Sequence, residues 1–158
     1  QVDITPDMTT PVLQDILAKM GARLMIRVLD DLALNGHVHA TAQPDIGVTH
    51  APLLAKDMAV MDWTRDALAL DRQIRALTPW PGTHTTARGT VMKILSARVS
   101  DNTTKAVPGT VLSRDGHVAC GAGTVLQITE IQVPTGKKIN IAAAINGGYL
   151  AVGDVFGG

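Results

Sequence analysis

Residues 61–82 read MDWTRDALALDRQIRALTPWPG and contain both tryptophans of the chain. Four apolar residues in this stretch recur at helical intervals: Ala67, Leu70, Ile74 and Leu77. Because this spacing puts the four side chains on one face, it predicts an amphipathic helix between the tryptophans. The pattern is helical before the stretch and strand-like after it, so the stretch joins two kinds of structure. We expect Trp63 and Trp80, which flank the helix, to be core residues.

Both ends of this helix carry sequence signals. Asp62 or Thr64 can cap its start, with Asp66 in the first turn, because short polar side chains accept hydrogen bonds from the free N–H groups there. Pro79 and Pro81 predict its end, since proline lacks an N–H and disfavours the helical conformation in the residue before it.

The first part of the chain is also predicted to be helical. Apolar residues keep a helical period from about residue 11 to 34, after a Thr10-Pro11 start and before an Asn35-Gly36 end. We expect a break or kink at Gly21. The apolar stripe is too large for solvent, so it predicts a neighbouring domain upstream, and the chain itself is expected to be a fragment.

Short strands are predicted from residue 83 onward. Alternating runs cover residues 91–99 and 124–133, and turn signals such as Asp115-Gly116 and residues 134–136 separate the strands. A further strand is expected at 108–112 and a helical or irregular piece at 141–145. The chain is therefore expected to be α+β, with an N-terminal helical segment and linker followed by a small closed β-barrel.

Composition restricts the function classes. The 158 residues have a formal net charge of zero, but residues 1–59 carry about −3 and residues 60–158 about +3. A modest basic bias is compatible with nucleic-acid binding and does not by itself establish it. The single cysteine, Cys120, excludes an internal disulfide and is expected to be a small buried residue. No run of about 18 apolar residues predicts a membrane span.

A histidine pair raises the question of a metal site. His37 and His39 are two residues apart and His50 follows later, so imidazole ligands are available. No third ligand has suitable spacing, and the segment resembles a linker, so no metal site is expected.

Several motifs, in order along nearly the whole chain, resemble those of methionyl-tRNA formyltransferase. They are Asp62-Trp63, Ile74-Arg75-Ala76, Pro79-Trp80-Pro81-Gly82, Pro108-Gly109-Thr110-Val111, Gly121-Ala122-Gly123, Gly136-Lys137-Lys138 and Ile145-Asn146-Gly147. The resemblance implies that residues 1–39 are the helical tail of a catalytic domain, 40–58 an interdomain linker and 59–158 an OB-like barrel domain.

The resemblance also implies a function. The family transfers a formyl group from 10-formyltetrahydrofolate to the amino group of methionyl initiator tRNA. Its catalytic Asn, His and Asp lie upstream of the residues that match this chain, so no catalytic residue and no cofactor site is expected here. The implied partners are initiator tRNA and an N-terminal catalytic domain. The implied location is the cytoplasm, and a monomer with no membrane partner is expected.

The family's linker and C-terminal domain contact tRNA through basic side chains, which position the acceptor end through phosphates. The residues that match this role are Lys56, Arg72, Arg75, Lys93, Lys137 and Lys138. Arg75 can instead pair with Asp71, four residues earlier on the helix.

Two other functions fit the same residues. The chain can be the C-terminal module of another folate-dependent enzyme that acts on a sugar nucleotide or on formyltetrahydrofolate itself. It can also be a scaffold barrel that binds no RNA and only packs on a partner. Binding of tRNA at low salt would distinguish the first hypothesis from the scaffold.

Overall fold

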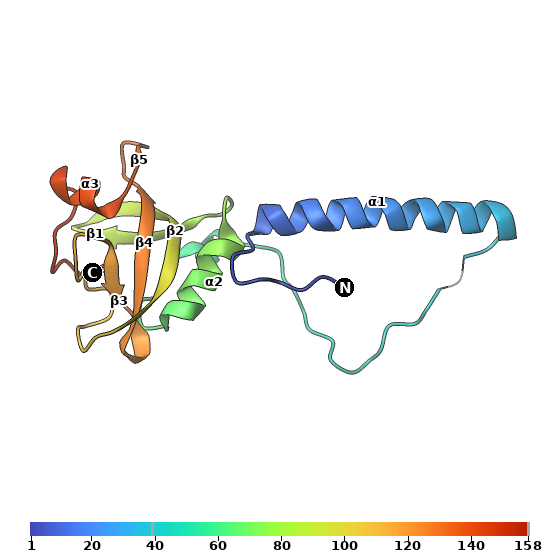
Figure 1. The fold of residues 1–158 in the computed structure, drawn as a ribbon, viewed down its shortest axis with the longest axis horizontal. Helices are drawn as coiled ribbons and strands as arrows, with labels where there is room; N and C mark the ends of the chain where they lie inside the picture. The colour runs from blue at the N-terminus through green and yellow to red at the C-terminus, as the bar shows by residue number, and fades with distance from the viewer. Residues whose placement is uncertain (39, 158) are drawn as a thin grey trace. The chain divides into compact units, whose positions relative to one another are not determined.

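A computed structural model describes residues 1–38 and 40–157, and the chain divides into two compact units, Gln1–Leu54 and Ala55–Gly158. The first unit contains helix α1 (Thr10–Asn35). The second contains the 3₁₀ helix η1 (Lys56–Ala59), helix α2 (Ala67–Leu77), a five-stranded sheet and helix α3 (Ile141–Asn146) (Figure 1). An α+β fold is therefore confirmed.

Helix α1 is continuous through Gly21, so the predicted break is wrong. A glycine inside a helix costs only about 1 kcal/mol relative to alanine, which good helix formers on either side offset. The start and end are as predicted: Pro11 lies in the first turn, and Gly36 closes the helix in the left-handed conformation with φ 71°. None of the α1 side chains is buried within the described structure.

Residues 40–55, most of the segment expected as a linker, form no helix or strand. His39, one member of the His37–His39 pair, lies outside the described residues. None of the described helices is long and apolar enough to cross a bilayer.

Helix α2 begins later than an N-cap at Asp62 or Thr64 would place it. Asp66 is its N-cap, and its carboxylate accepts a hydrogen bond from the Ala69 N–H at 2.8 Å. Asp62 instead accepts bonds from the N–H and the hydroxyl of Thr64, so Asp62 and Thr64 do not cap the helix. The four apolar residues of the predicted face are all buried: Ala67, Leu70, Ile74 and Leu77.

The sheet is antiparallel, in the order β1–β2–β4–β3, with β5 also paired to β4. The strands are β1 (Thr83–Ala87), β2 (Thr90–Thr103), β3 (His117–Ala119), β4 (Thr124–Gln132) and β5 (Lys138–Ile139). The described strands do not close into the expected barrel. Within the described chain the segment expected as a strand at 108–112 is no continuous strand: it makes the isolated bridges Thr110–Val155 and Val111–Val118 and backbone hydrogen bonds to residues 117–119 and 153–156.

Irregularities in the pairing of β2 and β4 change which side chains face the core. The register shifts between Ile94 and Ser96 and again between Ser96 and Ala97. A bulge interrupts strict alternation, because one extra residue on a strand reverses the faces that follow. The single alternating face expected for residues 91–99 is therefore wrong: Lys93 is exposed and Ala97 packs against the core.

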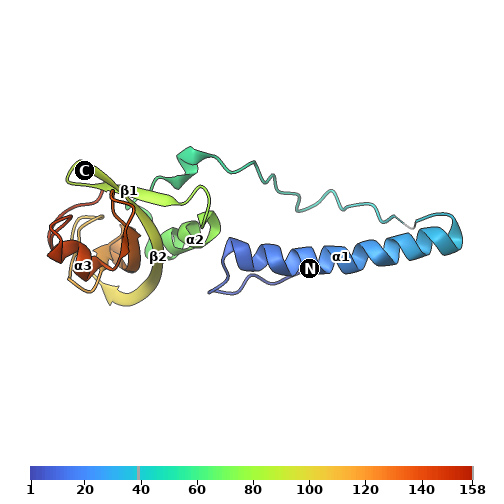
Figure 2. The ribbon, with the colours of Figure 1, turned by 90° about the horizontal axis from the view of Figure 1, so that it is seen from above.

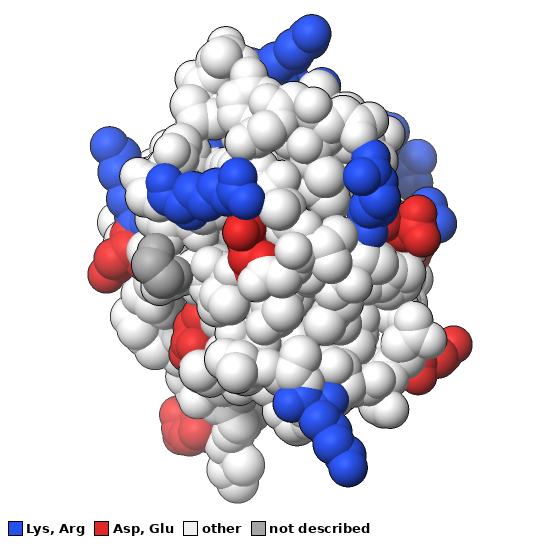
Figure 3. All heavy atoms as spheres, turned by 90° about the vertical axis from the view of Figure 1, so that its left-hand side faces the viewer, with Lys and Arg blue, Asp and Glu red and all other residues white. Residues whose placement is uncertain are grey.

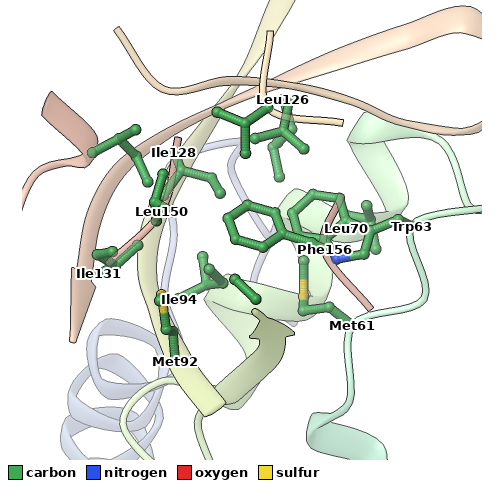
Figure 4. Packing of buried hydrophobic residues seen from close by; sticks show 14 of the residues in the cluster. Met61, Trp63, Leu70, Met92, Ile94, Leu126, Ile128, Ile131, Leu150 and Phe156 are labelled. Atoms are coloured by element: carbon green, nitrogen blue, oxygen red, sulfur yellow. The ribbon is translucent and has the colours of Figure 1, made fainter. Parts of the chain in front are cut away.

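The core of the second unit lies between the sheet and α2 (Figure 4). Trp63 is 4% exposed, its ring stacks on Phe156 with centroids 5.3 Å apart, and its Nε1–H donates to the Thr85 hydroxyl. Trp80 is 57% exposed, so its predicted place in the core is wrong. It lies in the short turn after α2, beyond the apolar face of the helix. In Figure 2, α2 and α3 lie at opposite ends of the second unit, and buried residues of both helices, Leu70 and Ile141 among them, belong to this one core cluster.

Candidate nucleic-acid interface

A row of four polar side chains crosses the sheet at one register level. His84 of β1 lies opposite Lys93 of β2, Lys93 lies opposite Gln132 of β4, and Gln132 lies opposite Lys138 of β5. Directly opposite residues in antiparallel strands point to the same face, so all four side chains share one face of the sheet. We call this set the cross-strand row.

The cross-strand row presents its two lysines to solvent. Lys93 and Lys138 are exposed, and His84 and Gln132 are half-buried between their neighbours. The two lysines are two strands apart, which separates their backbones by roughly 10 Å. Gln132 donates a hydrogen bond from Nε2 to the Gly136 carbonyl at 2.8 Å. This bond ties the row to the turn that leads into β5.

The same face remains polar farther along the strands. Arg98 lies opposite Gln127, and Gln127 lies opposite His117 of β3. Glu130, opposite Ser96, lies between this second group and the cross-strand row. One carboxylate therefore weakens the positive potential of the face without neutralising it.

Lys137 does not share the face of Lys138. The Val133 N–H donates to the Lys137 carbonyl, so the hairpin continues to this pair, and Val133 is buried on the core side. Successive residues of a strand point to opposite faces. Lys137 and Lys138 therefore lie on different faces, and only Lys138 joins Lys93.

The other three basic residues lie on helices. Arg75 is paired with Asp71 at 2.9 Å, as their spacing predicted, and both side chains are largely buried. Arg72 is exposed on α2, whose buried face packs on the core side of the sheet. Lys56 is exposed in η1. The structure thus unites Lys93 and Lys138 and does not bring all six predicted residues together.

Figure 3 shows Lys and Arg side chains scattered over the face that it presents, with acidic side chains among them. This distribution agrees with the zero net charge of the chain. A nucleic-acid interface here would depend on a few individual contacts between basic side chains and phosphates more than on a strong overall positive potential.

Two other features of the sequence concern a thiol and possible metal ligands. Cys120 is 1% exposed, and burial raises the pKa of its thiol to about 11, which keeps it in the unreactive protonated form. Among the described residues, no group of three His, Cys, Asp or Glu side chains is placed to hold a metal ion.

His84 and Gln132 are members of the row that sequence reasoning missed. Their signal was the strand pairing, which aligns residues 84, 93, 132 and 138 across four strands. Turn positions could have suggested the pairing of 132 with 138, because residues 134–136 form the turn between them. The bulges between β2 and β4 make the rest hard to derive.

The sequence profile of the formyl transferase C-terminal domain family matches residues 53–148. This match covers more than half of the chain and most of the second unit, and the chain belongs to that family. The resemblance that the motifs indicated is confirmed.

Curated relatives narrow the comparison to methionyl-tRNA formyltransferases. The enzyme of Gluconacetobacter diazotrophicus is 45% identical over 157 residues, which are 99% of this chain and 50% of that protein. The Ralstonia pickettii enzyme is 40% identical over 94% of this chain and 46% of its own length. The chain thus spans about half the length of the curated relatives that it matches.

A solved structure supports the fold. A variant of HypX from Aquifex aeolicus matches with a TM-score of 0.61 at 19% identity, over 91% of this chain and 27% of that one. At this identity the likeness concerns the fold alone.

Proposed function

We propose that this chain is the tRNA-positioning part of a methionyl-tRNA formyltransferase. In this role it holds methionyl initiator tRNA while a separate catalytic domain transfers the formyl group from 10-formyltetrahydrofolate to the methionine amino group. The chain itself contributes neither a catalytic residue nor a folate site. It works in the cytoplasm as a monomeric portion of the enzyme, and relatives 40–45% identical over nearly its whole length support this assignment.

The cross-strand row is the observation that carries the proposal. Lys93 and Lys138 are exposed, lie on one face and are separated by a glutamine that can donate or accept hydrogen bonds. Lysine ammonium groups bind phosphate oxygens as mobile point charges and require no base sequence. Such a row fits a phosphate backbone that crosses the strands. Arg72, Lys56 and Lys137 are candidates for additional contacts from other surfaces.

Reversing both charges of the row tests the proposal. We expect the Lys93→Glu/Lys138→Glu variant to bind initiator tRNA at least tenfold more weakly than the wild-type chain at low salt. Each lost phosphate contact removes a released counterion, so the slope of log affinity against log salt should become shallower by about two. Fluorescence titrations at several salt concentrations measure both quantities.

A matched control reverses two exposed charges in the first unit, Lys19→Glu/Arg23→Glu. This variant has the same net charge as the row variant, so an equal loss of affinity in both would show that only net charge matters and would contradict the row. A wild-type chain that binds no tRNA at low salt would refute the proposed function.

A further inference from the structure

A hollow of about 380 Å³ opens at the opposite end of β4 from the cross-strand row. Val125, near the start of β4, lies in its lining, whereas the row crosses β4 at its last residue, Gln132. The rest of the lining comes from the end of β2 and from the segment leading into β3: Asn102, Thr103, Thr104, Leu112, Ser113 and His117. We call this the β2-end hollow. The hollow is largely open to solvent.

The lining combines an apolar surface with neutral polar groups. Leu112 is half-buried and offers apolar contact, while Val125, also in the lining, is only 1% exposed. The His117 ring is oriented by Ser113, whose Oγ lies 3.1 Å from His117 Nδ1. Within the described part of the chain, no hydrogen bond engages the side-chain amide of Asn102, so its donor and its acceptor are both available to a ligand.

The lining has no Lys, Arg, Asp or Glu side chain, so it is unsuited to a phosphate or another strongly charged group. A neutral planar heterocycle fits better, because it needs apolar contact on its face and amide or hydroxyl partners at its edge. Unpaired RNA bases are recognised by stacking on flat side chains, histidine among them, and by hydrogen bonds to their edges, and the lining supplies the His117 ring for the first. Arg98 lies opposite Gln127, which lies opposite His117, so a cation for the adjoining phosphate is close to the hollow.

We infer that the β2-end hollow receives one unpaired base of an RNA strand whose phosphates cross Lys93 and Lys138. This inference rests on the proposed function and adds a second contact of a different chemical kind. Strict alternation would put Gln132 opposite to Val125 and Gln127, but the register shift at Ser96 inserts an extra residue of β4 between them and reverses the faces. Leu126, Ile128 and Ile131 accordingly all belong to the core, and Val125, Gln127 and Gln132 lie on the other face. The seven residue-to-residue steps from Val125 to Gln132 extend roughly 23 Å, a length that a few nucleotides cover.

The direct test uses the four ribonucleoside 5′-monophosphates as probes of the ¹⁵N-labelled full chain. Shifts of the Asn102 side-chain amide and of the His117 amide at millimolar nucleotide would support the hollow as the base site. Shifts confined to the surroundings of Lys93 and Lys138, or no shifts, would overturn the inference.

A second test fills or weakens the hollow without changing charge. Thr103→Phe puts an aromatic ring at the exposed end of β2, and Asn102→Ala removes the free amide. We expect each variant to bind initiator tRNA roughly tenfold more weakly, the size of one lost base contact, with an unchanged salt slope. Thr41→Phe is the matched control, because Thr41 is exposed outside the domain.

The two proposals fail in different ways. Wild-type affinity for tRNA in both Thr103→Phe and Asn102→Ala would contradict base binding in the hollow and would leave the proposed phosphate contacts of the cross-strand row unaffected. Failure of the wild-type chain itself to bind tRNA would refute the proposed function, and the inference with it. Circular dichroism of each variant shows whether a loss of binding reflects a loss of fold.

Discussion

Replacing Gly121 by alanine is expected to prevent stable folding of residues 55–158. A Cβ at this position would lie 1.7 Å from the Thr64 carbonyl oxygen and 2.5 Å from its carbon. The Gly121 N–H also donates to the carbonyls of Trp63 and Arg65, at 3.0 and 2.8 Å. Because the obstruction is backbone, no side-chain rotation relieves it, and the turn before α2 must move away from η2 (Gly121–Gly123).

We expect this change to lower the free energy of unfolding by at least about 4 kcal/mol, which exceeds the usual effect of a point substitution. Urea unfolding followed by circular dichroism measures the loss. Gly89→Ala is the control, since Gly89 has φ 71° with open space around it. An alanine there is expected to cost only the strain of the left-handed conformation, about 1 kcal/mol in the free energy of unfolding. Equal unfolding midpoints for Gly121→Ala and the wild-type chain would show that the backbone at Thr64 can move away from position 121 without loss of stability.

The second large effect is expected from Trp63→Ala. This side chain is 4% exposed, stacks on Phe156 and donates to the Thr85 hydroxyl at 3.0 Å (Figure 4). Truncation leaves a cavity and removes the partner of a hydroxyl that is itself buried, so both the packing and the hydrogen-bond losses apply. The expected cost is about 3–5 kcal/mol in the free energy of unfolding.

The chain supplies its own matched control, because its other tryptophan is in the opposite environment. Trp80 is 57% exposed, so Trp80→Ala is expected to cost less than about 1 kcal/mol. Urea unfolding by far-ultraviolet circular dichroism compares the two without relying on tryptophan fluorescence. A Trp80 variant as unstable as the Trp63 variant would mean that Trp80 is buried in the folded chain.

The buried face of α2 and the end of α1 rest on local spacing and were predicted correctly from sequence. The buried face of α2 follows from the positions of Leu70 and Ile74 alone, because a helix repeats within a few residues. Gly36 likewise ends α1 by its own conformation. The exposure of Trp80 was not predictable, because it depends on where the chain turns after α2 and not on residue type.

The candidate interface was predicted only in part. Basic residues are visible in a sequence, so Lys93 and Lys138 could be named, but their alignment through Gln132 depends on the register of three strands. Bulges set that register here, and a sequence pattern marks them poorly. The β2-end hollow combines the end of β2, the segment leading into β3 and the start of β4, and had no sequence signal at all.

Strand β4 has partners on both of its edges. It pairs with β2 along one edge, and along the other with β3 at its start and with β5 at its end, while the Ile128 N–H between them donates to the Gly116 carbonyl. Its amide protons should therefore exchange with solvent only when the whole domain opens, whereas those of residues 40–54 exchange early. Both contact regions that we propose for RNA lie along this doubly paired strand, so we expect the distance between them to be fixed before any ligand arrives.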